Sequence, residues 1–294
     1  MTINRYLIFR TDRIGDFLVS AILIKNIKKN DHNAHITLVA SEKNYSYIKT
    51  FPYVDNVLKL ENNFISKLKI LLYLHKLKYE YIIIHDNKKR SKIVSLFLRA
   101  ENKIYIQNSE LSHIDIIKNI LKKMDFQYFD ETLNTLEHLK KSKSNDSNLI
   151  QLHFDEKWIY DDYIKKFVPI EPSEIELVSF IKKLITKNDI KLIITTGYAL
   201  PLIINKIKPN LNELKIKVYE NLNFSQLEII TSKSGILISC HGAISHVAAA
   251  NNIKQIDIID MSYNYSKWTN HFRNYNYLYR DNFSKLSCRI LDLI

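Results

Sequence analysis

The chain has 294 residues, 46% of them hydrophobic and only four of them glycine. This length exceeds the usual single-domain size, so two domains of roughly 150 residues are expected. The formal net charge of +12 favours an anionic partner: a nucleotide, a phosphorylated glycolipid, an acidic membrane surface or nucleic acid. A lysine-rich surface that reflects composition alone is the alternative. Two cysteines, Cys240 and Cys288, argue against a disulfide framework, and no CxxC metal spacing exists.

The N-terminal apolar run is too short for a signal peptide and leads directly into the charged residues Arg10, Asp12 and Arg13. No segment provides about eighteen uninterrupted apolar residues, the length that a membrane-spanning helix needs. The sequence therefore predicts a cytoplasmic protein, and peripheral contact with the inner face of the cytoplasmic membrane remains open.

Strands and helices are predicted to alternate in the first half of the chain. Apolar runs rich in β-formers predict strands at 6–9, 35–40, 57–60, 79–86 and 103–106. Apolar residues at three-to-four spacing predict helices at 17–27, 64–77 and 114–124, and another from the polar cluster after residue 86 through Leu98. This alternation is typical of a mostly parallel α/β sheet.

A polar segment, 140–148, has almost no apolar content and is interpreted as a linker between domains. After it, strands are predicted at 149–152, 190–195, 215–219, 235–239 and 255–259, and helices at 156–167, 173–187 and 281–293. We therefore expect two α/β domains facing each other across a cleft. Their predicted bounds are 1–146 and 147–275, followed by a closing C-terminal helix at 276–294.

The stretch from Arg10 to Asp16 joins the first predicted strand to the first helix through a polar turn that contains Gly15. In parallel α/β sheets, ligands bind outside the carboxyl ends of the strands. Asp16 would then stand at the mouth of a cleft, on the first turn of a helix. A carboxylate there also suits plain helix capping, because it faces the positive end of the helix dipole.

Two further stretches suggest binding of a diphosphate. The segment 235–250 is a buried strand that leads through Gly242 into a helix of small residues, where exposed amides suit phosphate oxygens. His246 lies about one turn into that helix, and a histidine satisfied within the core is the alternative. Near the start of the second half, Lys157 could neutralise a phosphate as a point charge, or be a solvated lysine at a helix start.

Taken together, these stretches resemble a known family. Residues 10–20 resemble the N-terminal signature of glycosyltransferase family 9, the heptosyltransferases of bacterial surface polysaccharide synthesis. Residues 81–86 with Arg90 and Ser91 resemble its strand before the acceptor-side loop, and 153–158 the segment that opens its donor domain. Residues 239–250 are similar to its glycine-to-histidine motif. The resemblance spans most of the chain and implies the GT-B fold, two Rossmann-like domains across a cleft.

The resemblance also implies the roles of individual residues. Asp16 would be the general base that takes the proton of the acceptor hydroxyl. Lys157 and the amides near Gly242 and Ala243 would stabilise the leaving diphosphate without a metal, and the sugar would be transferred with inversion. The full set implied to bind the nucleotide-sugar donor is His153, Lys157, His241, Gly242, Ala243 and His246. The set implied to bind a glycolipid or polysaccharide acceptor is Arg10, Thr11, Arg13, Asp86 and Arg90.

One departure concerns the donor: the family usually carries an aspartate where this chain has His241. The donor sugar is therefore left open between heptose and related sugars. A nucleotide-sugar epimerase of the same fold is an alternative, as is a basic protein that binds anionic glycan or nucleic acid without catalysis. No nucleic-acid motif is present, and the lysines are spread along the chain. A transferase-like protein that binds its ligands without catalysis is a further alternative. The expected reaction needs no cofactor beyond the nucleotide-sugar substrate.

Overall fold

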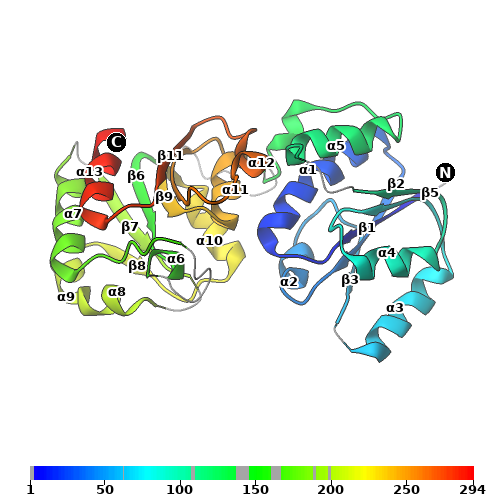
Figure 1. Ribbon diagram of the computed structural model, residues 1–294, viewed down its shortest axis with the longest axis horizontal. Coiled ribbons are helices and arrows are strands. Elements are labelled where there is room, and N and C mark those ends of the chain that lie inside the picture. Colours follow the sequence, from blue (N-terminus) through cyan, green and yellow to red (C-terminus); the bar gives the residue numbers. More distant parts are fainter. Residues whose placement is uncertain are drawn as a thin grey trace. The chain divides into compact units, whose positions relative to one another are not determined.

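The chain divides into two compact units, Met1–His138 and Leu139–Ile294, in the computed structural model. Each unit is built around its own parallel sheet (Figure 1). The structure describes residues 3–61, 63–106, 110–136, 146–159, 167–187, 190–197 and 200–294. None of the helices within these ranges is long and apolar enough to cross a membrane.

The sheet of the N-terminal unit has five strands in the order β3-β2-β1-β4-β5. The strands are β1 (Asn4–Arg10), β2 (Ala34–Ala40), β3 (Asn56–Lys59), β4 (Lys78–Ile84) and β5 (Arg99–Tyr105). The central strand β1 pairs with β2 up to Arg10↔Ala40 and with β4 up to Phe9↔Ile84. This register brings the loops that follow β1, β2 and β4 together at one edge of the sheet.

Helices connect these strands, as the apolar spacing predicts. They are α1 (Ile14–Asn30), α2 (Tyr45–Ile48), α3 (Phe64–His75), α4 (Lys89–Leu96), α5 (His113–Lys122) and the 3-10 turn η1 (Asp130–Leu133). The central strand is fully buried from Tyr6 to Phe9, as is α1 from Phe17 to Ile27. The first loop is therefore fixed at both ends by elements embedded in the core.

The C-terminal unit has a six-stranded sheet in the order β11-β10-β9-β6-β7-β8. The strands are β6 (Asp146–His153), β7 (Lys191–Thr195), β8 (Lys217–Tyr219), β9 (Ser234–Cys240), β10 (Lys254–Ile259) and β11 (Tyr275–Tyr279). Strand β9 pairs with β6 up to His153↔Ser239 and with β10 up to Cys240↔Ile258. The carboxyl ends of these three strands therefore lie side by side.

An aromatic cluster joins three of the helices of this unit, α6 (Glu156–Ile159), α7 (Glu174–Thr186) and α13 (Phe283–Leu293). The other described helices are α8 (Leu202–Lys206), α9 (Lys208–Glu213), α10 (Phe224–Thr231), α11 (Ala243–Ala250) and α12 (Ser266–Thr269). The rings of Phe154 and Trp158 stack with centroids 4.9 Å apart. Phe283 meets Phe180 edge-on at 5.6 Å, so α13 packs against α7 over one core.

Every predicted strand is present, and both sheets are parallel in all their described pairs, so the α/β class is confirmed. The predicted linker 140–148 is wrong at its end. Asp146–Asn148 belong to β6, because Asp146 pairs with Ser234 and extends the ladder to β9. Residues 140–145 lie outside the described ranges, as do 160–166 of the helix predicted at 156–167, of which α6 is the described part.

Candidate functional site

A cavity of about 430 Å³ opens at the carboxyl end of the N-terminal sheet. Its lining comes from the loops after β1 and β2, the start of α1, the segment before α3 and the start of α4. The lining residues are Thr11, Asp12, Arg13, Asp16, Ser41, Glu42, Lys43, Leu60, Glu61, Lys88 and Arg90. The cavity thus brings together Asp16 and three of the five residues implied to bind an acceptor. The other two, Arg10 and Asp86, are buried and are not part of the lining.

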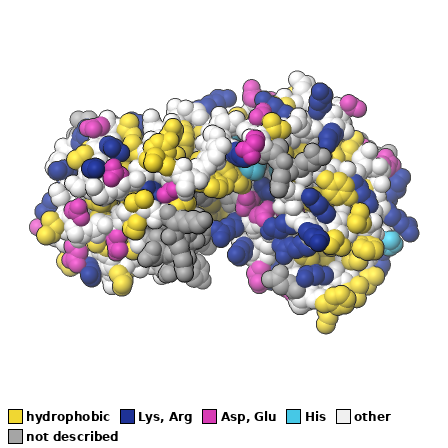
Figure 2. Space-filling model, in the orientation of Figure 1, with side chains coloured by type: hydrophobic (Ala, Val, Ile, Leu, Met, Phe, Trp, Pro, Cys, Tyr) yellow, Lys and Arg dark blue, Asp and Glu magenta, His cyan; other side chains and the backbone are white. Residues whose placement is uncertain are grey.

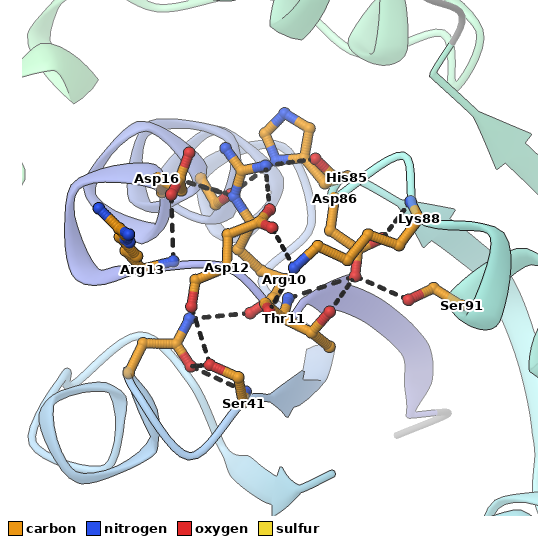
Figure 3. Close-up of polar contacts among 12 residues, drawn as sticks. Arg10, Thr11, Asp12, Arg13, Asp16, Ser41, His85, Asp86, Lys88 and Ser91 are labelled. Carbon is orange, nitrogen blue, oxygen red and sulfur yellow. Dashed lines mark hydrogen bonds and ion pairs between the residues drawn. The ribbon is translucent and has the colours of Figure 1, made fainter. Parts of the chain in front are cut away.

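Asp86 ties the loop after β1 to the loop after β4 (Figure 3). Its Oδ2 accepts hydrogen bonds from Thr11 Oγ1 at 2.5 Å, Thr11 N at 3.3 Å and Ser91 Oγ at 2.7 Å. Its Oδ1 accepts the backbone N–H of Lys88 at 3.1 Å. These bonds match a buried carboxylate with the donors that it needs, so both loops keep a fixed shape.

The buried guanidinium of Arg10 holds the turn that carries Asp16. Arg10 Nε donates to the backbone oxygen of Asp16 at 2.9 Å, and Nη1 donates to the backbone oxygen of His85 and to Asp12 Oδ2. The ring of His85 contacts α1, with Nδ1 2.7 Å from Ser20 Oγ. Burial, and then the charge of Arg10, hold the pKa of His85 well below its usual value, so the imidazole is neutral.

Asp16 caps α1 and also faces the cavity. Its Oδ2 accepts the backbone N–H of Arg13 at 3.0 Å, which is the capping interaction that the sequence suggested. Within the described part of the chain, its Oδ1 has no hydrogen-bond partner. The capping bond fixes the carboxylate and leaves one oxygen available to a ligand.

Lys88 and Arg90 close the cavity from the α4 side. Lys88 Nζ pairs with Asp12 Oδ1 and donates to the backbone oxygen of Thr11 at 2.7 Å. Arg90 Nη2 donates to Thr11 Oγ1 at 2.9 Å. Asp12 and Ser41 were not among the predicted site residues. Ser41 follows β2 directly, so the rule that ligands meet the carboxyl ends of parallel strands could have found it.

In the C-terminal unit, Lys157 lies where β6 and β9 end. Its Nζ is 2.7 Å from Asp155 Oδ2 and 3.4 Å from the backbone oxygen of Cys240. Burial alone would raise the pKa of Asp155, but the charge of Lys157 and a hydrogen bond from His153 outweigh it and hold that pKa low. Burial alone would lower the pKa of Lys157, but the charge of Asp155 outweighs burial and raises that pKa. The ammonium is therefore charged.

Gly242 leaves the space that this ammonium occupies. A Cβ at position 242 would lie 2.6 Å from Lys157 Nζ. The backbone there is extended, with φ −175°, and α11 begins at the next residue, Ala243. A fixed lysine beside the first amides of a helix is an arrangement suited to phosphate oxygens. Arg280, which the sequence analysis missed, follows β11 and donates from Nη2 to the backbone oxygen of Lys157 at 2.7 Å.

His241 is oriented by a fully buried carboxylate. Its Nδ1 is 2.8 Å from Asp257 Oδ2, and Asp257 Oδ1 accepts Ser239 Oγ at 2.9 Å and Ser245 Oγ at 2.8 Å. The side chain of His241 is 11% exposed and that of Asp257 is 0% exposed. With Nδ1 engaged by Asp257, Nε2 is the ring nitrogen left for a ligand.

The two remaining predicted histidines are more buried. His153 lies next to Asp155, the carboxylate that pairs with Lys157: its Nδ1 is 3.0 Å from Thr195 Oγ1 and its Nε2 is 3.6 Å from Asp155 Oδ2. The ring of His246 lies 5.3 Å from the ring of Phe272 and 5.9 Å from that of His241. Among the described residues, no group of three or more histidine, cysteine and acidic side chains is arranged to hold a metal ion.

These two sheets define the GT-B fold. E. coli heptosyltransferase WaaC, in a structure with ADP, matches with a TM-score of 0.73 over 98% of this chain and 98% of that chain, at 11% identity. A glycosyltransferase family 9 protein from Veillonella parvula matches with a TM-score of 0.67 over 95% of this chain and 87% of its own, at 12% identity. The predicted resemblance to family 9 is thus confirmed in the fold.

UDP-GlcNAc 2-epimerase from Methanocaldococcus jannaschii shares the same architecture. It matches with a TM-score of 0.57 over 99% of this chain and 92% of that chain, at 12% identity. No protein-family model matches the sequence. The search of curated proteins found no similar sequence.

Proposed function

We propose that this protein is an inverting glycosyltransferase that moves a sugar, heptose or a related one, from a nucleotide-sugar to a lipid-linked or polysaccharide acceptor. The observation that carries the proposal is the placement of Asp16, a carboxylate that is fixed by its capping bond and lines a cavity. The likeness in fold to a heptosyltransferase that binds ADP supports it. The proposed acceptors are intermediates of lipopolysaccharide, lipooligosaccharide or capsule synthesis at the cytoplasmic face of the membrane.

In the proposed reaction, the acceptor hydroxyl attacks the anomeric carbon of the donor sugar, and Asp16 takes its proton. The bond from the anomeric carbon to the diphosphate breaks, and the nucleoside diphosphate leaves with the bonding electrons. Lys157 and the first amides of α11, near Gly242 and Ala243, would stabilise the negative charge on that diphosphate. One direct displacement inverts the anomeric centre, and no step requires a metal.

Other residues of the two units would bind or position the substrates. Thr11, Arg13 and Arg90 line the cavity and would contact the acceptor, whereas Arg10 and Asp86 would act by holding the loops in place. On the donor side, His241 would present Nε2 to the sugar or its phosphate. His153 and His246 would pack beneath the donor.

The Asp16→Asn variant tests the base. Asparagine keeps an oxygen that accepts the Arg13 amide, so the helix cap and the fold should persist. Loss of a general base should lower kcat by about 10²- to 10⁴-fold. The assay first identifies the donor by a thermal-shift screen against ADP, UDP, GDP, CMP and their common sugars, and then measures transfer. Full transfer by the variant would remove the base assignment.

The alternative function, a nucleotide-sugar epimerase, is supported by the similarity in fold to UDP-GlcNAc 2-epimerase. An epimerase needs no acceptor, so it would convert UDP-GlcNAc to its 2-epimer when the sugar nucleotide alone is supplied. Formation of that product without acceptor would replace the transferase proposal, whereas release of nucleotide only in the presence of acceptor would exclude the epimerase.

A further inference from the structure

Helices α3 and α4 expose large hydrophobic side chains on one side of the N-terminal unit. Phe64 is 77% exposed, Leu96 is 67% exposed and Phe97, directly after α4, is 60% exposed. The complete set, here called the α3/α4 surface, is Phe64, Ile65, Leu68, Leu72, Tyr73, Ile93, Leu96 and Phe97. Isolated exposed hydrophobic residues are common on proteins, but a group on two neighbouring helices marks an interaction surface.

The two helices present this surface together. His75 Nδ1, at the end of α3, is 2.8 Å from the backbone oxygen of Phe97, which joins their C-terminal ends. On their inner faces Ile70 and Leu71 of α3 and Val94 of α4 pack against one hydrophobic cluster over the sheet. The inner faces therefore already form the core, and the exposed hydrophobic residues are a second, outward set. Figure 2 shows hydrophobic side chains at the lower right, with Lys and Arg beside them, where Figure 1 places α3 and α4.

The charges on these segments are all positive. Residues 64–76 and 88–98 contain no aspartate or glutamate. Besides Lys88 and Arg90, which bond to the loop after β1, the basic residues of these segments are Lys67, Lys69, Lys76, Lys89 and Lys92. Segments that bind at the surface of an anionic bilayer combine these two kinds of residue. The hydrophobic side chains enter the headgroup region, and the lysines attract acidic lipids.

A second copy of the chain suits this surface less well. A two-fold dimer places the same patch on both sides of the interface, so the lysines of one copy would face those of the other. Like charges brought together in this way oppose association. Charge complementarity therefore favours an anionic surface.

The same helices begin at the cavity. Leu60 and Glu61, just before α3, and Lys88 and Arg90, around the start of α4, are part of its lining. We propose that the α3/α4 surface binds the protein to a bilayer that contains anionic lipid, with the mouth of the Asp16 cavity beside the headgroups. The benefit of such binding rests on the proposed function: a lipid-linked acceptor would reach Asp16 without leaving the membrane.

Sedimentation with vesicles tests the inference without donor or acceptor. The full-length protein is mixed with vesicles of phosphatidylcholine alone, or of phosphatidylcholine with phosphatidylglycerol, at low and at high salt. We expect binding to the anionic vesicles that weakens as salt rises. A variant with Leu72→Ser, Leu96→Ser and Phe97→Ser should lose this binding. A variant with Lys67→Gln, Lys69→Gln, Lys89→Gln and Lys92→Gln should lose about fivefold in affinity for each lysine removed.

The matched control carries Ile175→Ser, Leu202→Ser and Met261→Ser, three strongly exposed hydrophobic residues of the C-terminal unit. It should bind vesicles like the wild type. No binding to anionic vesicles, or equal loss in the control, overturns the inference. Light scattering measures the oligomeric state. If the wild type is a dimer that does not bind vesicles, and the Leu72, Leu96 and Phe97 changes make it a monomer, the surface binds a second copy instead. Because transfer to a soluble acceptor is measured separately, failure of either proposal is distinguishable from failure of the other.

Discussion

The Gly242→Ala variant tests whether Lys157 and the start of α11 bind the diphosphate of a nucleotide. The extended backbone at Gly242, φ −175°, accepts any residue. The new Cβ would lie 2.6 Å from Lys157 Nζ. An ordinary contact is about 3.5 Å, so the ammonium must move away by roughly 1 Å. Because Nζ is the end of a flexible side chain, and alanine reduces the entropy of the unfolded chain, the unfolding free energy should change by less than about 1 kcal/mol.

Nucleotide binding should respond much more strongly. A hydrogen bond to a charged group contributes about 1.5–3 kcal/mol, so losing the one from Lys157 should weaken binding of the nucleoside diphosphate about 10- to 100-fold. Isothermal titration calorimetry measures the affinity, and urea unfolding measures the stability of the same preparation. Wild-type affinity in Gly242→Ala would refute the reasoning, because the displaced ammonium would then make no contact with the nucleotide.

Gly235→Ala is the matched control. Its Cβ would lie 2.5 Å from the backbone oxygen of Ser147 and 2.7 Å from that of Asp146. Backbone atoms in the β6–β9 ladder have no free rotation that relieves such contacts, so we expect a loss of about 1–3 kcal/mol in stability. The folded fraction should still bind nucleotide normally. Equal losses of stability in the two variants would make Gly242 a structural glycine.

Two further predictions concern buried polar groups. Asp257→Asn removes the charge that His241, Ser239 and Ser245 share, and should lower the unfolding free energy by about 2–3 kcal/mol; an unchanged urea midpoint would contradict this. Burial lowers the pKa of His271 to about 4. The unfolded chain therefore takes up this proton first, near pH 6.5, so stability is lost as pH falls. His271 should contribute about 2.5 kcal/mol of loss between pH 7 and pH 4.5, which His271→Leu removes; a parallel pH profile for the variant would contradict the assignment.

All strands of the two sheets except β11 were predictable, because they are short, strongly apolar runs. Continuous hydrophobic character is what burial on both faces of a parallel sheet requires, and Tyr6–Phe9 and Ile82–Ile84 show it plainly. Strand β11, Tyr275–Tyr279, was missed because it is an edge strand of alternating tyrosines and has no such run. The short helices α2, α8, α9 and α12 span too few residues for a helical period to emerge.

The candidate site was predictable where a side chain directly follows a strand. The turn that carries Asp16 was found in this way, whereas Asp86 and His153 were implied by the resemblance to family 9. The hydrogen bonds around His241 were not predictable, because the bond from Ser239 to Asp257 joins positions 18 apart in sequence and depends on strand register. Sequence spacing alone does not show which strands are neighbours in the sheet. Asp257, fully buried in β10, therefore gave no signal of its own.

The bonds of Asp86 have a consequence for redesign of the cavity beside Asp16. Since one carboxylate oxygen serves both Thr11 and Ser91, the loops after β1 and β4 share a single anchor. Substitutions in the two loops should therefore show strong energetic coupling in a double-mutant cycle. An engineer who alters one loop alone would weaken the other as well. A change of preference for the proposed acceptor is therefore better sought by exchanging both loops together while Asp86 itself is kept.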